Sequence, residues 1–129
     1  MIKKIIIIDY GLGNILSIKN AVNHCGHNVI VTSERKIIES ASHIILPGVG
    51  AFPSAMRRFK DLDLMDAIHK AKKRKVFILG ICLGMQLLFT DSEEFELTSG
   101  INLIKGNVVK LDKLGSNFNS KLPNIGWRN

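Results

Sequence analysis

A cysteine lies between two closely spaced glycines in the segment Gly80-Ile81-Cys82-Leu83-Gly84. Apolar residues 76–79 precede this segment, and leucines at helical spacing follow it. This order predicts a buried strand, a sharp turn and a helix that packs back on the strand. Such a turn lifts a side chain above the sheet edge and places it at a helix N-terminus, where the dipole favours a thiolate. We therefore predict that Cys82 is a nucleophile.

The second cysteine supplies a contrast, because cysteine is often only a small buried apolar residue. Cys25 lies in His24-Cys25-Gly26-His27, at the end of a helical pattern and with no comparable turn around it. We interpret Cys25 as structural, and two histidines beside one cysteine at a helix end make a poor metal site. Gln86, four residues beyond Cys82, lies on the same helical face and can present its amide to a substrate bound at the sulfur.

A second glycine-rich turn, Pro47-Gly48-Val49-Gly50, follows an apolar strand and precedes a helical pattern. Acyl transfer through a cysteine requires hydrogen-bond donors for the tetrahedral oxyanion. The backbone N–H of Leu83, directly after the cysteine, is one predicted donor, and that of Gly50 is the other. A plain glycine turn without a chemical role is the alternative.

The rest of the chain predicts the elements that position these turns. Apolar runs predict strands at residues 5–8, 29–31, 43–46 and 76–79, and helical patterns start after Asn14 and cover residues 55–59 and 64–71. This alternation predicts an α/β fold in three layers, with a largely parallel sheet flanked by helices. The glycine-rich turns after Ile8, Leu46 and Leu79 should converge at the carboxyl edge of that sheet. A further strand is expected at residues 107–111.

Composition restricts the class of protein. The 129 residues suit one domain spanning 1–129, no segment is long enough for a membrane span, and two unlike cysteines indicate a reducing, cytoplasmic location. The net charge of +7 allows a nucleic-acid or acidic partner. The densest basic run, residues 70–75, instead ends a helical pattern and contains no aromatic residue. We interpret it as a helix C-terminus and expect no nucleic-acid binding and no membrane binding.

The segment from Gly80 to Gln86 resembles the nucleophile motif of class I glutamine amidotransferases. Its continuation to Phe89, with Ser92-Glu93-Glu94 behind it, is similar to the glutaminase subunits of imidazole glycerol phosphate synthases. The opening Tyr10-Gly11-Leu12-Gly13-Asn14 fits the same family. The resemblance implies a flavodoxin-like amidotransferase domain of which residues 1–129 are the N-terminal two-thirds, incomplete at the C-terminus.

The resemblance also implies an activity without a cofactor or a metal: hydrolysis of glutamine to glutamate and ammonia through a thioester on Cys82. It places Gly50 and Leu83 in the oxyanion hole, and Gln86, Gly48 and Val49 against the substrate. The ammonia would pass to a (β/α)-barrel cyclase subunit that makes imidazole glycerol phosphate in histidine biosynthesis, as a heterodimer.

The residues that the resemblance directs towards this partner are Asn14, Pro123 and Trp127.

The family's general base comes from a His-x-Glu pair well after the nucleophile, and no histidine follows Cys82. We therefore expect little or no activity from the chain alone, and exposed sheet edges where closing strands are missing. Three alternatives stay open: a non-catalytic subunit that only binds the barrel, a paralogue for surface-sugar synthesis, and a nucleotide-binding domain. The second draws on Gly100-Ile101-Asn102, where the family usually has Gly-Leu-Gly. The third draws on Gly11-Leu12-Gly13, whose fingerprint lacks a third glycine.

Overall fold

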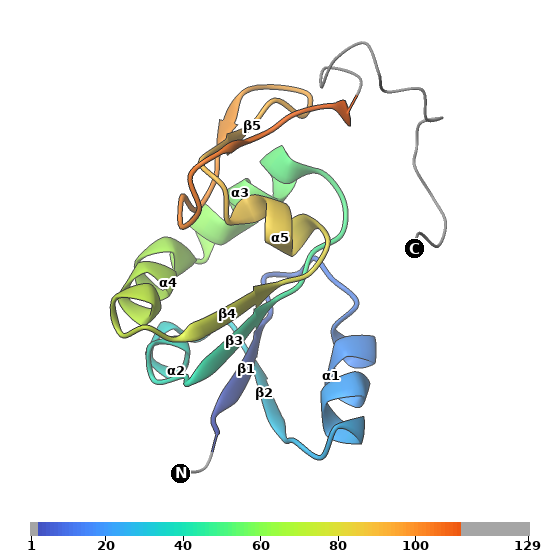
Figure 1. The fold of residues 1–129 in the computed structure, drawn as a ribbon, viewed down its shortest axis with the longest axis vertical. Coiled ribbons are helices and arrows are strands. Elements are labelled where there is room, and N and C mark those ends of the chain that lie inside the picture. Colours follow the sequence, from blue (N-terminus) through green and yellow to red (C-terminus); the bar gives the residue numbers. More distant parts are fainter. Residues whose placement is uncertain (1–2, 112–129) are drawn as a thin grey trace.

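A four-stranded parallel sheet forms the centre of the computed structural model, which describes residues 3–111 (Figure 1). The strands lie in the order β2-β1-β3-β4. Their bounds are β1 (Ile5–Ile8), β2 (Val29–Thr32), β3 (His43–Leu46) and β4 (Phe77–Gly80). Every pairing is parallel, so the carboxyl ends of all these strands lie at one edge. The predicted α/β fold with a largely parallel sheet is confirmed.

Helices cover the two faces of the sheet unequally (Figure 1). Helix α1 (Ile15–His24) packs on the face that carries Ile5, Ile7 and Ile45. The opposite face carries four helices, α2 (Arg35–Glu39), α3 (Phe52–Asp61), α4 (Leu64–Lys73) and α5 (Leu83–Leu87). Helix, sheet and helix therefore form the three predicted layers.

The central strand β1 consists of four isoleucines, and all four are buried. Successive side chains of a strand point to opposite faces. Ile6 and Ile8 accordingly join the large core under α2 to α5, while Ile5 and Ile7 join the smaller core under α1. An unbroken β-branched run is what a strand covered on both faces requires, which is why the sequence predicted it correctly.

Strand β4 departs from the prediction of a buried strand. Phe77 is 73% exposed and Leu79 is 57% exposed, whereas Ile78 between them packs against the large core. β4 is an edge strand of the sheet. Helix α1 packs on β1 and β3 instead, through Ile5, Ile7 and Ile45. Among residues 3–111, nothing covers the side chains of β4 on the α1 face of the sheet. The apolar side chains of β4 are therefore buried on the opposite face only.

Two further features differ from the sequence-based expectation. Helix α2 was missed because its five residues contain only two apolar side chains, too few to show a helical period, although Ile38 is fully buried. The strand expected at 107–111 is shorter, since β7 covers Asn107–Val108. It belongs to a small second sheet with β5 (Asp91–Ser92) and β6 (Thr98–Ser99), in the order β6-β5-β7.

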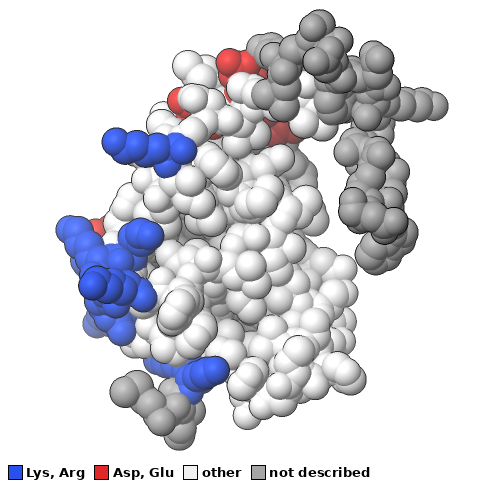
Figure 2. All heavy atoms as spheres, in the orientation of Figure 1, with Lys and Arg blue, Asp and Glu red and all other residues white. Residues whose placement is uncertain are grey.

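The basic run lies at the end of α4, as interpreted from the sequence. The last turn of α4 holds Lys70, Lys72 and Lys73. Lys70 pairs with Glu39 at 3.1 Å and with Asp66 at 2.8 Å. Figure 2 shows the largest group of Lys and Arg over the region of α4, and most of the visible Asp and Glu nearer to β5. No helix in the described part of the chain is long and apolar enough to cross a membrane.

Candidate active site

The segment around Cys82 forms a sharp turn between β4 and α5. Cys82 has φ +55° and ψ −120°, a backbone conformation that residues other than glycine rarely adopt. Such strain persists only where the surroundings enforce it, and it is common at functional positions. The side chain of Cys82 is exposed, and α5 starts at the next residue. The predicted strand, turn and helix are therefore confirmed, although α5 has only five residues.

The two glycines that flank Cys82 are required by close packing. A Cβ atom on Gly80 would lie 2.5 Å from the Cα of Met85. A Cβ atom on Gly84 would lie 2.0 Å from the carbonyl oxygen of Leu46. Real Cβ atoms do not approach backbone this closely, so any larger residue would push α5 away from β3 and β4. These contacts fix Cys82 at the carboxyl edge of the sheet.

Turns after three different strands meet at this edge, as the sequence predicts. The N–H of Ile81 donates to the carbonyl of Leu46 at 2.9 Å, which joins the turn after β4 to the end of β3. The hydroxyl of Tyr10, in the turn after β1, donates to the carbonyl of Pro47 at 2.6 Å. A Cβ atom on Gly13 would lie 2.9 Å from the Cβ of Pro47, so this turn packs on the same proline.

Backbone N–H groups without an acceptor occur in the turn of Cys82 and in the loop after β3. Within residues 3–111, no group accepts a hydrogen bond from the N–H of Leu83, nor from the N–H groups of Gly48, Val49 and Gly50. Gly50 has φ +97° and is exposed, whereas Gly48 is buried. Unpaired N–H groups close to a thiol can stabilise a negatively charged oxygen that develops there. The arrangement can therefore support acyl transfer.

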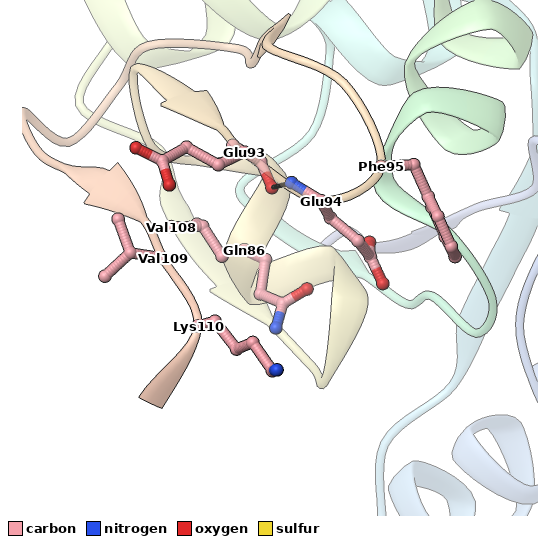
Figure 3. A pocket seen from close by; sticks show the side chains of 8 residues that line it. Gln86, Glu93, Glu94, Phe95, Val108, Val109 and Lys110 are labelled. Atoms are coloured by element: carbon pink, nitrogen blue, oxygen red, sulfur yellow. Dashed lines mark hydrogen bonds between the residues drawn. The ribbon is translucent and has the colours of Figure 1, made fainter. Parts of the chain in front are cut away.

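A pocket of about 390 Å³ opens one helical turn beyond Cys82 (Figure 3). Gln86 reaches into it from α5, and the N–H of Gln86 donates to the carbonyl of Cys82 at 3.3 Å. Glu94 and Lys110 lie on its other sides, so the lining combines an amide, a carboxylate and an ammonium group. Cys82 itself is not among the described residues that line this pocket.

Glu94 has a position that the sequence did not reveal. Its carboxylate accepts a hydrogen bond from the N–H of Phe52 at 2.8 Å, at the start of α3. Its own N–H donates to the hydroxyl of Ser92, which is fully buried. Glu94 therefore ties the small sheet to the segment after Gly50. The acidic residues of this segment contributed only to the family resemblance, since their spacing alone predicts no contact with α3.

The residues expected to face a partner divide into two groups. Asn14 is exposed and caps α1, because its Oδ1 accepts a hydrogen bond from the N–H of Ser17 at 3.3 Å. This contact explains an asparagine here without a partner, and the partner role stays a prediction. Pro123 and Trp127 lie outside the described residues.

The histidines of the chain lie away from the cysteine. His43 is at the start of β3, opposite Phe77 at the amino end of β4, and its ring stacks on Phe77 with centroids 5.2 Å apart. His69 lies within α4, and His24 and His27 lie at the exposed end of α1, where Cys25 is also exposed. Residues 3–111 hold no cluster of three or more His, Cys, Asp or Glu that could bind a metal.

A parallel sheet with an exposed cysteine in a strained strand-to-helix turn, opposite a glycine-rich loop with unpaired N–H groups, defines an α/β protein suited to cysteine-dependent acyl transfer. The family model "Glutamine amidotransferase class-I" matches residues 6–125. This protein belongs to the class I glutamine amidotransferase family.

Its curated relatives include subunits of one synthase. The chain is 46% identical over 126 residues to "Imidazole glycerol phosphate synthase subunit HisH 2" of Vibrio vulnificus, covering 96% of this chain and 58% of the relative. It is 41% identical to the HisH subunit of Lactococcus lactis over 97% of this chain and 59% of the relative. It is 42% identical to the HisH subunit of Staphylococcus aureus, over 97% of this chain and 61% of the relative. The chain thus spans about three fifths of the length of these relatives.

A solved structure described as a crystal structure of glutamine amidotransferase has a similar fold. The TM-score is 0.69 at 15% sequence identity, over 87% of this chain and 59% of that one. At this identity the similarity concerns the fold alone, and it agrees with the α/β architecture described above.

Proposed function

We propose that this chain carries the nucleophile, the oxyanion hole and part of the substrate pocket of a glutaminase. The thiolate of Cys82 attacks the side-chain carbonyl carbon of glutamine. The tetrahedral intermediate collapses as the amide nitrogen takes a proton, equivalent to the one released when the thiol ionised, and leaves as ammonia; a γ-glutamyl thioester remains. Water then hydrolyses the thioester to glutamate and restores the thiol. The observation that supports this proposal most strongly is the strained backbone of Cys82, held between two glycines that tolerate no side chain.

The negative charge of the intermediate would be held by the N–H groups of Leu83 and Gly50. Preorganised donors of this kind typically change rates by factors of about 10² to 10³ each. Because neither N–H has an acceptor within the described residues, both are available for this role.

Recognition of glutamine would use the pocket beyond Cys82. Gln86 can hydrogen-bond the substrate with its amide, and the carboxylate of Glu94 suits the substrate's ammonium group. Gly48 and Val49, in the loop before α3, would approach the substrate with their backbone. None of these contacts requires a cofactor or a metal.

The ammonia would be delivered to a (β/α)-barrel cyclase subunit. The named relatives belong to imidazole glycerol phosphate synthase, which supports histidine biosynthesis as the pathway. Asn14, Pro123 and Trp127 are the residues that we propose face this subunit. A heterodimer with the barrel is the expected assembly, and the cytoplasm the expected location.

A second candidate function is a subunit that binds the barrel without hydrolysing glutamine. It is favoured by the positions of the histidines in residues 3–111, none of which lies in the turns around Cys82. A cysteine hydrolase needs a base that takes a proton and returns it. Without one, acylation and thioester hydrolysis are both slow.

Ammonia release from glutamine, measured with and without the barrel cyclase, separates the two functions. Glutaminase activity predicts release that disappears in Cys82→Ala and persists in the matched control Cys25→Ala. Release that persists in Cys82→Ala contradicts the proposal. If nothing is released, alkylation of Cys82 by a chloroketone analogue of glutamine decides. Glutamine that protects Cys82 from the reagent supports a substrate site, and the lack of protection contradicts it.

A further inference from the structure

Tyr10 is the one tyrosine of the chain, and it is fully buried behind the candidate active site. Its hydroxyl donates to the carbonyl of Pro47 at 2.6 Å, a short hydrogen bond for two uncharged groups. Its ring meets the ring of Phe59 edge to face, with centroids 5.2 Å apart. The backbone carbonyl of Tyr10 accepts a hydrogen bond from Nε of Arg58 at 3.3 Å. Helix α3 therefore holds Tyr10 from two directions.

The hydrogen bond to Pro47 fixes the start of the glycine-rich loop. The carbonyl of Pro47 and the N–H of Gly48 belong to one planar trans peptide, so they point in opposite directions. When Tyr10 holds the oxygen on the buried side, the N–H of Gly48 must point away from Tyr10. One buried hydroxyl thereby sets the orientation of the first peptide of the loop.

Packing around Gly48 makes this arrangement tight. A Cβ atom on Gly48 would lie 2.7 Å from the hydroxyl oxygen of Tyr10 and 2.6 Å from the backbone nitrogen of Gly84. Gly48 thus lies between the phenol and the start of α5. Burial, and to a smaller extent the charge of Cys82, raise the pKa of Tyr10, as expected if the phenol lies close behind the cysteine.

Beyond Pro47 the loop has few fixed points. The carbonyl of Leu46 is held by Ile81, and that of Pro47 by Tyr10. The next anchored group is the N–H of Phe52, which donates to Glu94. Within the described residues, the N–H groups of residues 48–50 have no acceptor between these two anchors. Tyr10 is therefore the last support before the proposed oxyanion donor.

We propose that Tyr10 is a positioning residue of the oxyanion hole: its hydroxyl, acting through the Pro47 carbonyl, holds the loop 47–50 in the orientation that stabilises charge on the substrate bound at Cys82. This inference rests on the proposed function, since it assigns Tyr10 a role in that same site. Tyr10 touches no reacting atom, and it acts on the donors rather than on the substrate.

The test compares two alkylating reagents in a Cys25→Ser background, where Cys82 is the only thiol. A chloroketone analogue of glutamine reacts through a tetrahedral adduct and needs the oxyanion hole, whereas iodoacetamide needs only an accessible thiolate. In Tyr10→Phe we expect the chloroketone rate to fall roughly tenfold or more. The iodoacetamide rate should stay within about twofold, because the thiolate is unchanged.

Phe59→Leu is the matched control, because it weakens the packing of the Tyr10 ring but keeps the hydroxyl. It should leave the ratio of the two rates unchanged. Biosynthetic replacement of Tyr10 by fluorotyrosine alters only this phenol and keeps its hydroxyl as a stronger donor, so it should not lower the ratio. Equal falls with both reagents in Tyr10→Phe, or an equal change of the ratio in Phe59→Leu, would reduce Tyr10 to a packing residue and overturn the proposal.

Amide hydrogen exchange of Gly48, the one buried residue among 48–50, separates this inference from the proposed function. Loss of one hydrogen bond of about 1.4 kcal/mol corresponds to roughly tenfold faster exchange, which we expect in Tyr10→Phe and not in Phe59→Leu. If the parent protein reacts no faster with the glutamine chloroketone than with chloroacetone, the proposed function fails. Faster exchange in Tyr10→Phe would still support the positioning of the loop, and unchanged exchange would overturn it. Should Tyr10→Phe not fold, the fluorotyrosine protein decides: a stronger donor must slow this exchange, and an unchanged rate overturns the proposal.

Discussion

The two faces of the central sheet differ sharply in how they are covered. On the face under α2 to α5, Ile6, Ile8 and Leu46 are fully buried in one continuous core. On the other face, α1 covers β1 and part of β3, and none of its own residues is buried. A mainly apolar cleft of about 620 Å³ lies between α1 and strands β3 and β4. In Figure 2 the visible surface over β4 and α1 carries no Lys, Arg, Asp or Glu.

Residues 3–111 therefore complete the core on one face of the sheet, the closed face, and leave the other face, the open face, partly uncovered. All-parallel sheets occur almost only with both faces covered. The closed face carries the site, because Tyr10, Leu83 and Phe59 all belong to its core. The turn around Cys82 (residues 80–84, the elbow) is therefore supported by the well-packed half of the molecule. Ile81, directly before Cys82, is the residue of this turn that packs on the open face.

The largest contrast between the faces should come from phenylalanine truncation. Phe59 is fully buried on the closed face, and Phe59→Ala should lower the free energy of unfolding by about 3–5 kcal/mol. Phe77 is 73% exposed on the open face, and Phe77→Ala should cost less than about 1 kcal/mol, mainly through its stacking on His43. Urea denaturation of both variants measures the two values. Similar losses would show that Phe77 is covered in solution.

The glycines of the elbow should give the next largest effect. Gly84→Ala forces a Cβ atom against the carbonyl of Leu46, so we expect a loss of about 3 kcal/mol in unfolding free energy. Gly26→Ala is the control, since Gly26 has φ +81° but open space around it and should cost only about 1 kcal/mol. The two denaturation curves test whether the elbow is set by packing or by backbone conformation. Equal costs would contradict the close packing, because Gly84 has no positive φ that would itself require glycine.

Sequence patterns predicted those features that depend on neighbouring residues. The isoleucines of β1 and the glycines around Cys82 each carry a local signal of burial or close approach, and both predictions are confirmed. The exposure of Phe77 was not predictable, because an apolar strand has the same sequence whether one face or both are covered. The contacts of Tyr10 with Pro47 and of Glu94 with Phe52 join residues 37 and 42 positions apart. No local pattern encodes such pairs, so the structure was needed to find them.

Loss of the Tyr10 hydroxyl should have a moderate effect on stability. Tyr10→Phe leaves the buried carbonyl of Pro47 without its donor, which should cost about 1–3 kcal/mol in unfolding free energy. The cost also depends on pH, since burial raises the pKa of Tyr10 above the ordinary value of about 10. The unfolded chain then releases a proton at a pH where the folded chain retains it.

Stability should therefore be complete below about pH 10 and fall as the pH rises above it. Tyr10→Phe should remove this part of the alkaline decline. Chemical denaturation between pH 8 and 11, for the parent and the variant, measures it on the order of 1.4 kcal/mol for each pH unit. Parallel curves for both proteins would contradict the buried, protonated phenol.

The smallest change in stability should come from a charge on the open face. Leu79→Lys places an ammonium group at a position that is 57% exposed at the end of the sheet order, so unfolding free energy should change by less than about 0.5 kcal/mol. Ile78→Lys is the matched control: the same substitution one residue earlier points into the closed core and should prevent stable folding.

Self-association sharpens the same comparison. Exposed apolar strands at a sheet edge pair with other chains, and a lysine there blocks such pairing. Light scattering should therefore show less association for Leu79→Lys than for the parent, at unchanged stability. If Leu79→Lys instead unfolds the protein as Ile78→Lys does, the open face must be covered in solution, and the two faces would be equivalent after all. The difference in stability between Leu79→Lys and Ile78→Lys thus measures whether one face of the sheet or both faces are covered at β4.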